Sequence, residues 1–163
     1  TIWTSDILRD RVGMSEGTAA AGVTALVAGM AVGRIAGAKV LLRRDLDWVF
    51  VRSLFLAGLG FGVFWISTSV IPAMIGLAIC GLGVSAHFPV GLLRALRTAP
   101  GRSDLASARS SLAVGVAVGV GPFLLGALAD GMGTHRAFLV VPVFLILAGL
   151  CVHRSTPNAP PVN

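Results

Sequence analysis

Long apolar runs alternate with short polar links along almost the whole chain. Five of these runs are close to the roughly 20 residues that a helix needs to cross the hydrocarbon core of a bilayer. They cover residues 15–35, 48–66, 70–93, 105–128 and 137–152. The pattern predicts an all-α fold, a polytopic transmembrane helix bundle with five full spans.

The two ends of the chain break this pattern. The opening stretch TIWTSDILRD is too short and too polar to cross a membrane alone, and it lacks the positively charged start of a signal peptide. We interpret it as the end of a sixth helix that begins upstream. The closing stretch STPNAPPVN is polar and rich in proline, which favours disorder. The sequence thus predicts one bundle over residues 1–154 and a disordered cytoplasmic tail over 155–163.

Composition supports the membrane interpretation. Of the 163 residues, 55% are hydrophobic and only 12% are charged, whereas a soluble domain carries about 25% charged residues. The mean hydropathy is +0.88. A core of this size needs far fewer apolar residues, so the excess must face lipid. The two cysteines, Cys80 and Cys151, lie inside apolar runs, and they indicate neither a disulfide framework nor a metal site.

The basic residues indicate an orientation. The net charge is +6, but these residues form clusters between apolar runs rather than a stripe with aromatics, so we expect no nucleic-acid partner. Ten of the thirteen fall on one side of the predicted bundle. These ten are Arg34, Lys39, Arg43, Arg44, Arg52, Arg94, Arg97, Arg102, Arg109 and Arg154. Basic links favour the cytoplasm, so we expect a cytoplasmic C-terminus and a place in the plasma (inner) membrane.

Small residues recur every three or four positions in three of the runs, although glycine and proline weaken helices in water. In lipid, such residues let helix backbones approach closely. The run 105–128 carries Gly115, Gly119, Pro122 and Gly126 on one face. The run 15–35 continues as Gly22, Ala25, Gly29, Gly33 and Gly37, and the run 70–93 carries Gly76, Cys80, Gly83, His87 and Gly91. We expect these faces to be packing surfaces, with kinks at Pro89, Pro122 and Pro142.

Three stretches resemble the major facilitator superfamily of transporters. GVGPFLLGALADGMGTHRAF, residues 119–138, is similar to the eleventh transmembrane helix and the loop after it. GMAVGRIAGAKVLLRR, residues 29–44, is similar to the end of the eighth helix and its basic loop, without the acidic residue of the fuller signature. GLGVSAHFPVGL, residues 81–92, is similar to the tenth helix.

The resemblance implies that the chain is the C-terminal half of such a transporter, a fragment running from the end of helix 7 to helix 12. The function implied is transport of a small solute by alternating access, with H+ or Na+ as the candidate coupling ions. Its partners would be the lipid bilayer, the solute and the missing N-terminal half, with no cofactor or metal. The alternative is a non-transporting bundle, receptor-like or scaffold, or a subunit of a membrane-embedded enzyme. We find no nucleophile–base pair in the spans, which argues against an enzyme.

His87 is the clearest candidate for the substrate path, because a polar group deep in a membrane is costly and suggests function. It would bind substrate or carry a proton. The alternative is a histidine that hydrogen-bonds to a neighbouring helix or reaches the cytoplasmic interface. All seven acidic residues lie at or beyond the ends of spans.

Further candidates are weaker. Ser107, Ser110 and Ser111 would offer hydroxyl groups to a substrate, or simply hydrogen-bond to their own helix. Trp3 and Asp6, in what resembles helix 7, are cavity-lining candidates, with an interface belt as the alternative for Trp3. In the loop motif, the candidates are Gly33, Arg34, Gly37 and Lys39. Arg34 would form a gating ion pair with Asp45, Asp47 or a residue of the missing half, or else reach out to lipid headgroups.

Overall fold

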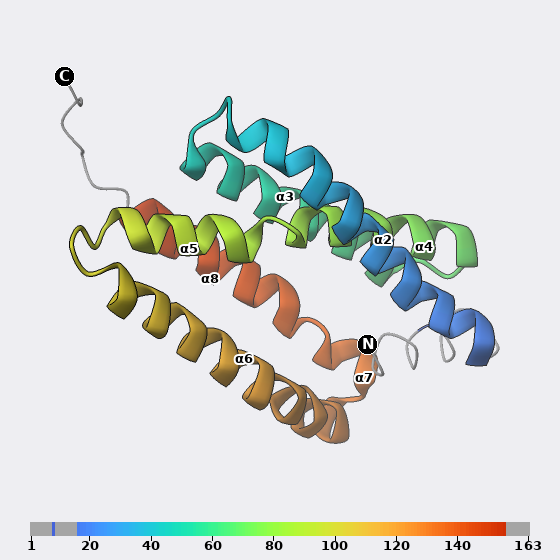
Figure 1. The fold of residues 1–163 in the computed structure, drawn as a ribbon. Coiled ribbons are helices and arrows are strands. Elements are labelled where there is room, and N and C mark those ends of the chain that lie inside the picture. The colour runs from blue at the N-terminus through green and yellow to red at the C-terminus, as the bar shows by residue number, and fades with distance from the viewer. Residues whose placement is uncertain (1–7, 9–15, 156–163) are drawn as a thin grey trace.

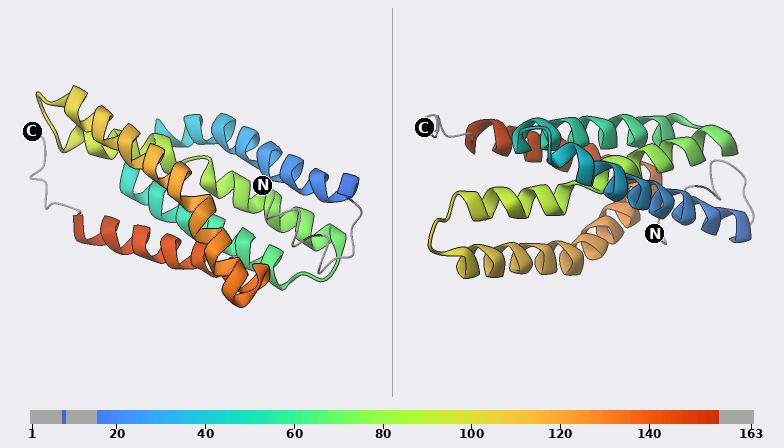
Figure 2. Two further views of the ribbon diagram at one scale, coloured as in Figure 1. Left: turned by 90° about the horizontal axis from the view of Figure 1, so that it is seen from below. Right: turned by 45° about the horizontal axis from the view of Figure 1, so that its top comes forward.

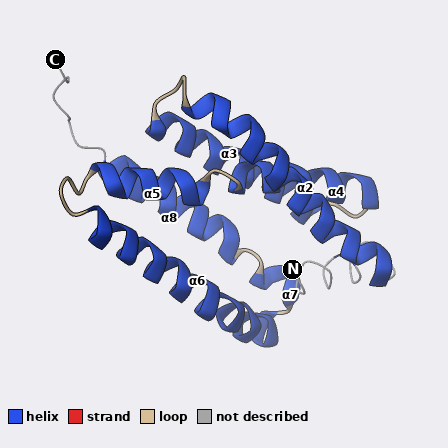
Figure 3. Ribbon diagram, in the orientation of Figure 1, coloured by secondary structure: helices blue, strands red, loops and turns tan. Residues whose placement is uncertain are grey.

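The computed structural model describes residue 8 and residues 16–155, and these form helices joined by short links, with no strand among them (Figures 1 and 3). The helices are α2 (Glu16–Leu41), α3 (Leu46–Ile66), α4 (Val70–Val84), α5 (His87–Arg97), α6 (Ser103–Met132), α7 (Thr134–Ala137) and α8 (Val140–Ser155). Trp3, Asp6 and the predicted tail beyond residue 155 lie outside the described residues.

The five predicted spans are confirmed. Five stretches of the described chain are long and apolar enough to cross a membrane, namely Ala20–Leu41, Leu46–Ile66, Val70–Arg97, Ser103–Met132 and Thr134–Arg154. The first helix extends six residues beyond its predicted end at residue 35, through the basic loop motif to Leu41. Charged side chains at a helix end can reach the water interface, so polarity alone does not mark where the helix stops.

The third span is broken into α4 and α5 at Ser85 and Ala86 (Figure 1). Pro89 explains the position of the break. In an unbroken helix the amide of residue 89 would donate a hydrogen bond to the carbonyl of Ser85, and proline has no N–H. The predicted kink at Pro89 is therefore confirmed as an interruption one turn earlier.

The other two prolines also lie where their spans bend or break. Helix α6 continues through Pro122, and it bends along its length (Figure 2). The fifth span is interrupted at Phe138 and Leu139, between α7 and α8. In an unbroken helix the amide of residue 142 would donate a hydrogen bond to the carbonyl of Phe138, and proline has no N–H. The predicted kink at Pro142 is therefore confirmed as an interruption one turn earlier, as at Pro89.

The links and the C-terminal helix end divide between the two ends of the bundle. Figure 1 shows the α2–α3 link, the α5–α6 link and the last turn of α8 at one end. The links from α3 to α4 and from α6 to α7 lie at the other end. The ten basic residues counted above belong to the first group, which we call the basic end. The alternation of links predicted from the sequence is thus present in the fold.

The core forms where α4 packs against both α2 and α3, which hardly touch each other. One buried cluster comprises Leu8, Phe61, Phe64, Ala73, Leu77 and Phe138. A second, at the basic end, comprises Leu46, Val49 and Val90, and it joins α3 to α5. Most of the remaining large apolar side chains are exposed, as expected where the surroundings are lipid.

Glycines bring these three backbones together. A Cβ added to Gly29 of α2 would lie 2.8 Å from the carbonyl carbon of Ala78 in α4, and one added to Gly81 would lie 2.9 Å from that of Leu26 in α2. On the other side of α4, a Cβ on Gly83 would lie 2.7 Å from the Cα of Ala57 in α3. Such distances leave no room for any side chain, so the predicted packing faces of runs 15–35 and 70–93 are confirmed at Gly29 and Gly83, whereas Gly81 is a contact that the predicted face did not include.

The glycines of α6 have no such neighbour in the described chain. An added Cβ at Gly115 or Gly119 would meet nothing within 4 Å. None of the residues in the most apolar part of α6 is buried, and both Pro122 and Gly119 are exposed. At Gly115 and Gly119 the predicted packing face therefore finds no partner among the described helices, and the role of this face, with Pro122 and Gly126, stays a prediction.

The alternating links give a test of topology. Cysteines introduced at Ser69 and at Asp104, both exposed and at opposite ends of the bundle, should react with an impermeant maleimide from opposite sides of the membrane. Ser67 is less suitable because it is 8% exposed. The background is Cys80→Ala with Cys151→Ala. Labelling of both positions from the same side would contradict the five-span arrangement.

The glycine contacts give a test of packing. Gly29→Ala should lower the free energy of unfolding by about 1–3 kcal/mol, because its methyl group would overlap the α4 backbone. Gly37→Ala, on the same helix with nothing within 4 Å, is the matched control and should be neutral or slightly stabilising. Denaturant titration in detergent measures both variants. Equal stabilities would show that α2 and α4 do not pack as described.

Candidate functional site

Polar side chains gather around the break between α4 and α5. Ser85 lies in the break and is only 5% exposed, and Ser53 of α3 is 8% exposed. Each hydroxyl donates to a carbonyl of its own helix, Ser85 Oγ to Leu82 O at 2.7 Å and Ser53 Oγ to Phe50 O at 2.8 Å. The break therefore places buried polar groups in an otherwise apolar span, which is where a membrane helix can meet a ligand or change its angle.

His87 is the first residue of α5 and faces α3. Its ring centroid lies 5.8 Å from that of Phe50, at an interplanar angle of 52°, and the ring also interacts with the backbone of Ser53. Its Nε2 is buried without a hydrogen-bond partner. This placement between two helices is what the packing alternative expects. A role in the substrate path stays a prediction.

Of the four loop-motif residues, Gly33 is the one at the break. A Cβ on Gly33 would lie 2.7 Å from the carbonyl oxygen of Leu82 and would collide with the hydroxyl of Ser85. Gly33 thus lets the last part of α2 pass directly over the interruption. Gly37 has open space around it, and Arg34 and Lys39 are exposed.

The ion pair at the basic end is not the one considered for Arg34. Asp47, in the first turn of α3, pairs with Arg94 near the end of α5. Asp45 caps α3, where its Oδ2 accepts a hydrogen bond from the backbone N–H of Asp47 at 2.9 Å. Both neighbouring carboxylates are therefore engaged elsewhere. Because the pair links two helices almost fifty residues apart in sequence, only the fold reveals it.

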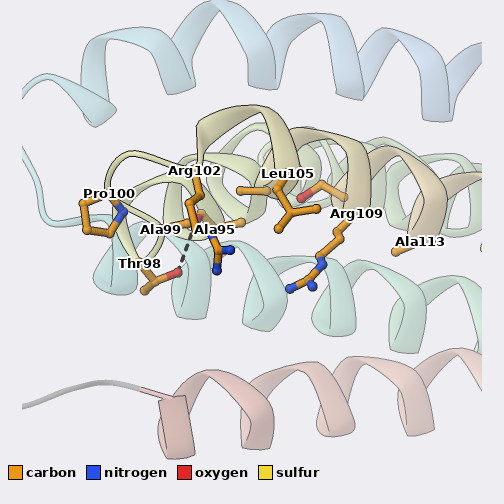
Figure 4. Close-up of a pocket in the computed structure, with 10 residues that line it drawn as sticks. Ala95, Thr98, Ala99, Pro100, Arg102, Leu105, Arg109 and Ala113 are labelled. Carbon is orange, nitrogen blue, oxygen red and sulfur yellow. Dashed lines mark hydrogen bonds between the residues drawn. The ribbon is translucent and has the colours of Figure 1, made fainter.

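A pocket of about 600 Å³ lies between α5 and α6 near the basic end (Figure 4). Arg102, Arg109 and Thr98 contribute its polar groups, together with Ser110. Figure 4 shows the two arginine side chains extending to the same side of α6. Of the three candidate serines, only Ser110 lines this pocket, while Ser107 is half-buried and Ser111 is exposed.

At the opposite end, Trp65 of α3 holds the short helix α7. Its ring stacks on His135 with centroids 4.4 Å apart, and its Nε1 donates a hydrogen bond to the carbonyl of His135 at 3.2 Å. A pocket of about 550 Å³ lies beside them. No local sequence pattern predicts this contact, because the two residues are seventy positions apart.

Nothing in the described residues resembles a metal centre, since no three histidine, cysteine, aspartate or glutamate side chains come together there. Five helices of membrane-crossing length, a broken third span and basic links at one end define the molecule instead as a polytopic helical membrane protein. Over residues 1–163 the chain matches the family model of the Major Facilitator Superfamily, and it belongs to that superfamily of secondary transporters. Comparison with curated proteins and with solved structures found no match.

Substitution of His87 separates its two possible roles. If the histidine only packs against α3, His87→Gln should retain transport, because glutamine keeps a hydrogen-bonding group of similar length. If the histidine carries a proton, His87→Gln should fail as fully as His87→Ala, and wild-type transport should depend on pH. Uptake into proteoliposomes at matched membrane abundance is the measurement. Normal transport by both variants would remove His87 from the mechanism.

Proposed function

We propose that this chain forms one half of a transporter that moves a small solute by alternating access, and that a second helical bundle packs against α6. The supporting observation is the face of α6 that carries Gly115 and Gly119. It is exposed along the apolar part of the helix, and nothing in the described chain lies within 4 Å of an added Cβ. Small residues on a membrane helix favour close contact with another helix rather than with lipid.

The family supports placing the solute between two bundles. Transporters built from structural repeats hold their substrate near the middle of the bilayer, where the halves meet. In this proposal the α6 face and the α5–α6 pocket, with Arg102, Arg109 and Ser110, look toward that meeting surface. The basic end faces the cytoplasm, because basic links are retained there, and the membrane is the plasma (inner) membrane.

The broken span supplies a place for movement. Helix α5 is attached to α3 by the ion pair between Asp47 and Arg94 and by the cluster of Leu46, Val49 and Val90. Helix α4 is fixed to α2 and α3 by its glycines. A change of angle at Ser85 and Ala86 would therefore move α5 relative to both α3 and α4, and it would have to break the ion pair and the apolar cluster.

The described acidic residues favour a coupling site elsewhere. Asp45, Asp47, Asp104 and Asp130 all lie at or close to helix ends. If H+ or Na+ drives the transport, we expect the acidic residue that binds it to belong to the second bundle.

Gly119 and Gly121 test whether α6 packs against a second bundle. They are two residues apart and so point about 200° apart around a helix, and both are open in this chain. Gly119→Leu should block uptake, because its side chain would stand where a partner backbone approaches. Gly121→Leu is the matched control and should keep uptake. A thermal-shift screen of solutes on the purified transporter identifies the substrate to be used.

The readout is uptake into proteoliposomes together with the amount of protein in the membrane. Wild-type uptake by Gly119→Leu would show that this face of α6 contacts lipid, and the proposed packing would then be wrong. Loss of uptake in both variants would also count against it, since it would show that any added bulk on α6 is harmful.

A further inference from the structure

The start of α3 combines positive charge, an aromatic ring and an exposed apolar face. The guanidinium carbons of Arg44 and Arg52 each lie 5.2 Å from the ring centroid of Trp48. Trp48 is 43% exposed, and both arginines are exposed. Attraction to the aromatic ring holds both cations at Trp48.

In the described part of the chain, nearby carboxylates form no ion pair with either of these cations. Asp47 is engaged with Arg94, and Asp45 caps α3. Within the part of the chain that the structure describes, neither Arg44 nor Arg52 has an acidic partner. Lys39 and Arg43 add two more positive charges around a pocket of about 630 Å³ that Arg44 and Trp48 also line. The site is therefore built for an anion.

An apolar surface continues from the same face of α3. Val51, Phe55 and Leu59 follow Trp48 at helical spacing and are 50%, 67% and 48% exposed. Beside them, α3 and α8 enclose a groove of about 320 Å³. Its lining includes Gly58 and Gly149, whose missing side chains leave it open. A soluble anion would make no favourable contact with this apolar surface, whereas the acyl chain of a lipid would pack against it and fill the groove.

We propose that Arg44, Trp48 and Arg52, with Lys39 and Arg43, bind the phosphate of an anionic phospholipid whose acyl chain lies in the groove between α3 and α8. Tryptophan is enriched at the level of the headgroups, and clustered basic residues next to a membrane span attract anionic lipids. The inference requires only that the helices cross a bilayer. It does not depend on transport or on the proposed second bundle.

Native mass spectrometry of the protein purified from membranes tests this directly. Phosphatidylglycerol, an anionic lipid, should bind more tightly than phosphatidylcholine. Arg44→Gln with Arg52→Gln should weaken its binding by roughly fivefold for each arginine removed, since each basic residue near the surface contributes about that much. Arg97→Gln with Arg102→Gln removes the same charge from the other basic link and is the matched control. It should leave the affinity within about twofold of wild type.

Two further measurements distinguish a phospholipid from a soluble phosphate as the ligand of this site. Glycerol 3-phosphate carries the headgroup chemistry without acyl chains and should compete poorly. Gly58→Leu should weaken phosphatidylglycerol binding by filling the groove. An added Cβ there meets only Leu145 Cδ1, at 3.8 Å, so the backbone need not move.

Three results would overturn the proposal. Equal binding of the two lipids would show no preference for an anion. Equal losses in the two double variants would show a general effect of charge rather than a site. Full competition by glycerol 3-phosphate would show that the site takes soluble phosphates. Thermal unfolding of each variant checks that the variant is folded. If the double arginine variant does not fold, Gly58→Leu still tests whether a lipid chain occupies the groove.

Discussion

The contact of bare backbones on both sides of α4 is the constraint on which the rest of this bundle depends. In lipid, apolar side chains gain little by leaving their surroundings for a helix interface, so close packing must supply the stability. Gly29 and Gly81 bring α2 onto one side of α4, and Gly60 and Gly83 bring α3 onto the other. Beyond the part of α4 that is packed on both sides, the span breaks because Pro89 removes a backbone hydrogen bond.

That break determines how the basic end is organised. Helix α5 leaves the line of α4 and attaches to the start of α3, through a small apolar cluster and through the pair of Asp47 with Arg94. The pair engages the one carboxylate of the first turn of α3. The guanidinium groups of Arg44 and Arg52 do not pair with this carboxylate, and both contact the ring of Trp48 instead. The packing of helices inside the bundle thus influences which charges remain on its surface.

The outer surface consists of two faces with different chemistry. The α6 face carries small residues and is open to another helix. The exposed face of α3 carries Trp48, Phe55 and Leu59, large side chains suited to lipid. The difference follows from side-chain size, because small residues gain contact only when a backbone comes close, whereas large ones fill the irregular space between lipid chains.

By itself, the sequence determined the all-α class, the five spans and the side on which the basic links lie, because hydropathy and charge act locally along a chain. It also marked Gly29 and Gly83 as packing positions from their spacing. Only the tertiary structure decided which helix each glycine meets, that His87 turns toward Phe50 of α3, and that Asp47 pairs with Arg94 rather than with Arg34. These outcomes depend on how helices distant in sequence are placed around α4, and no local pattern of residues contains that information.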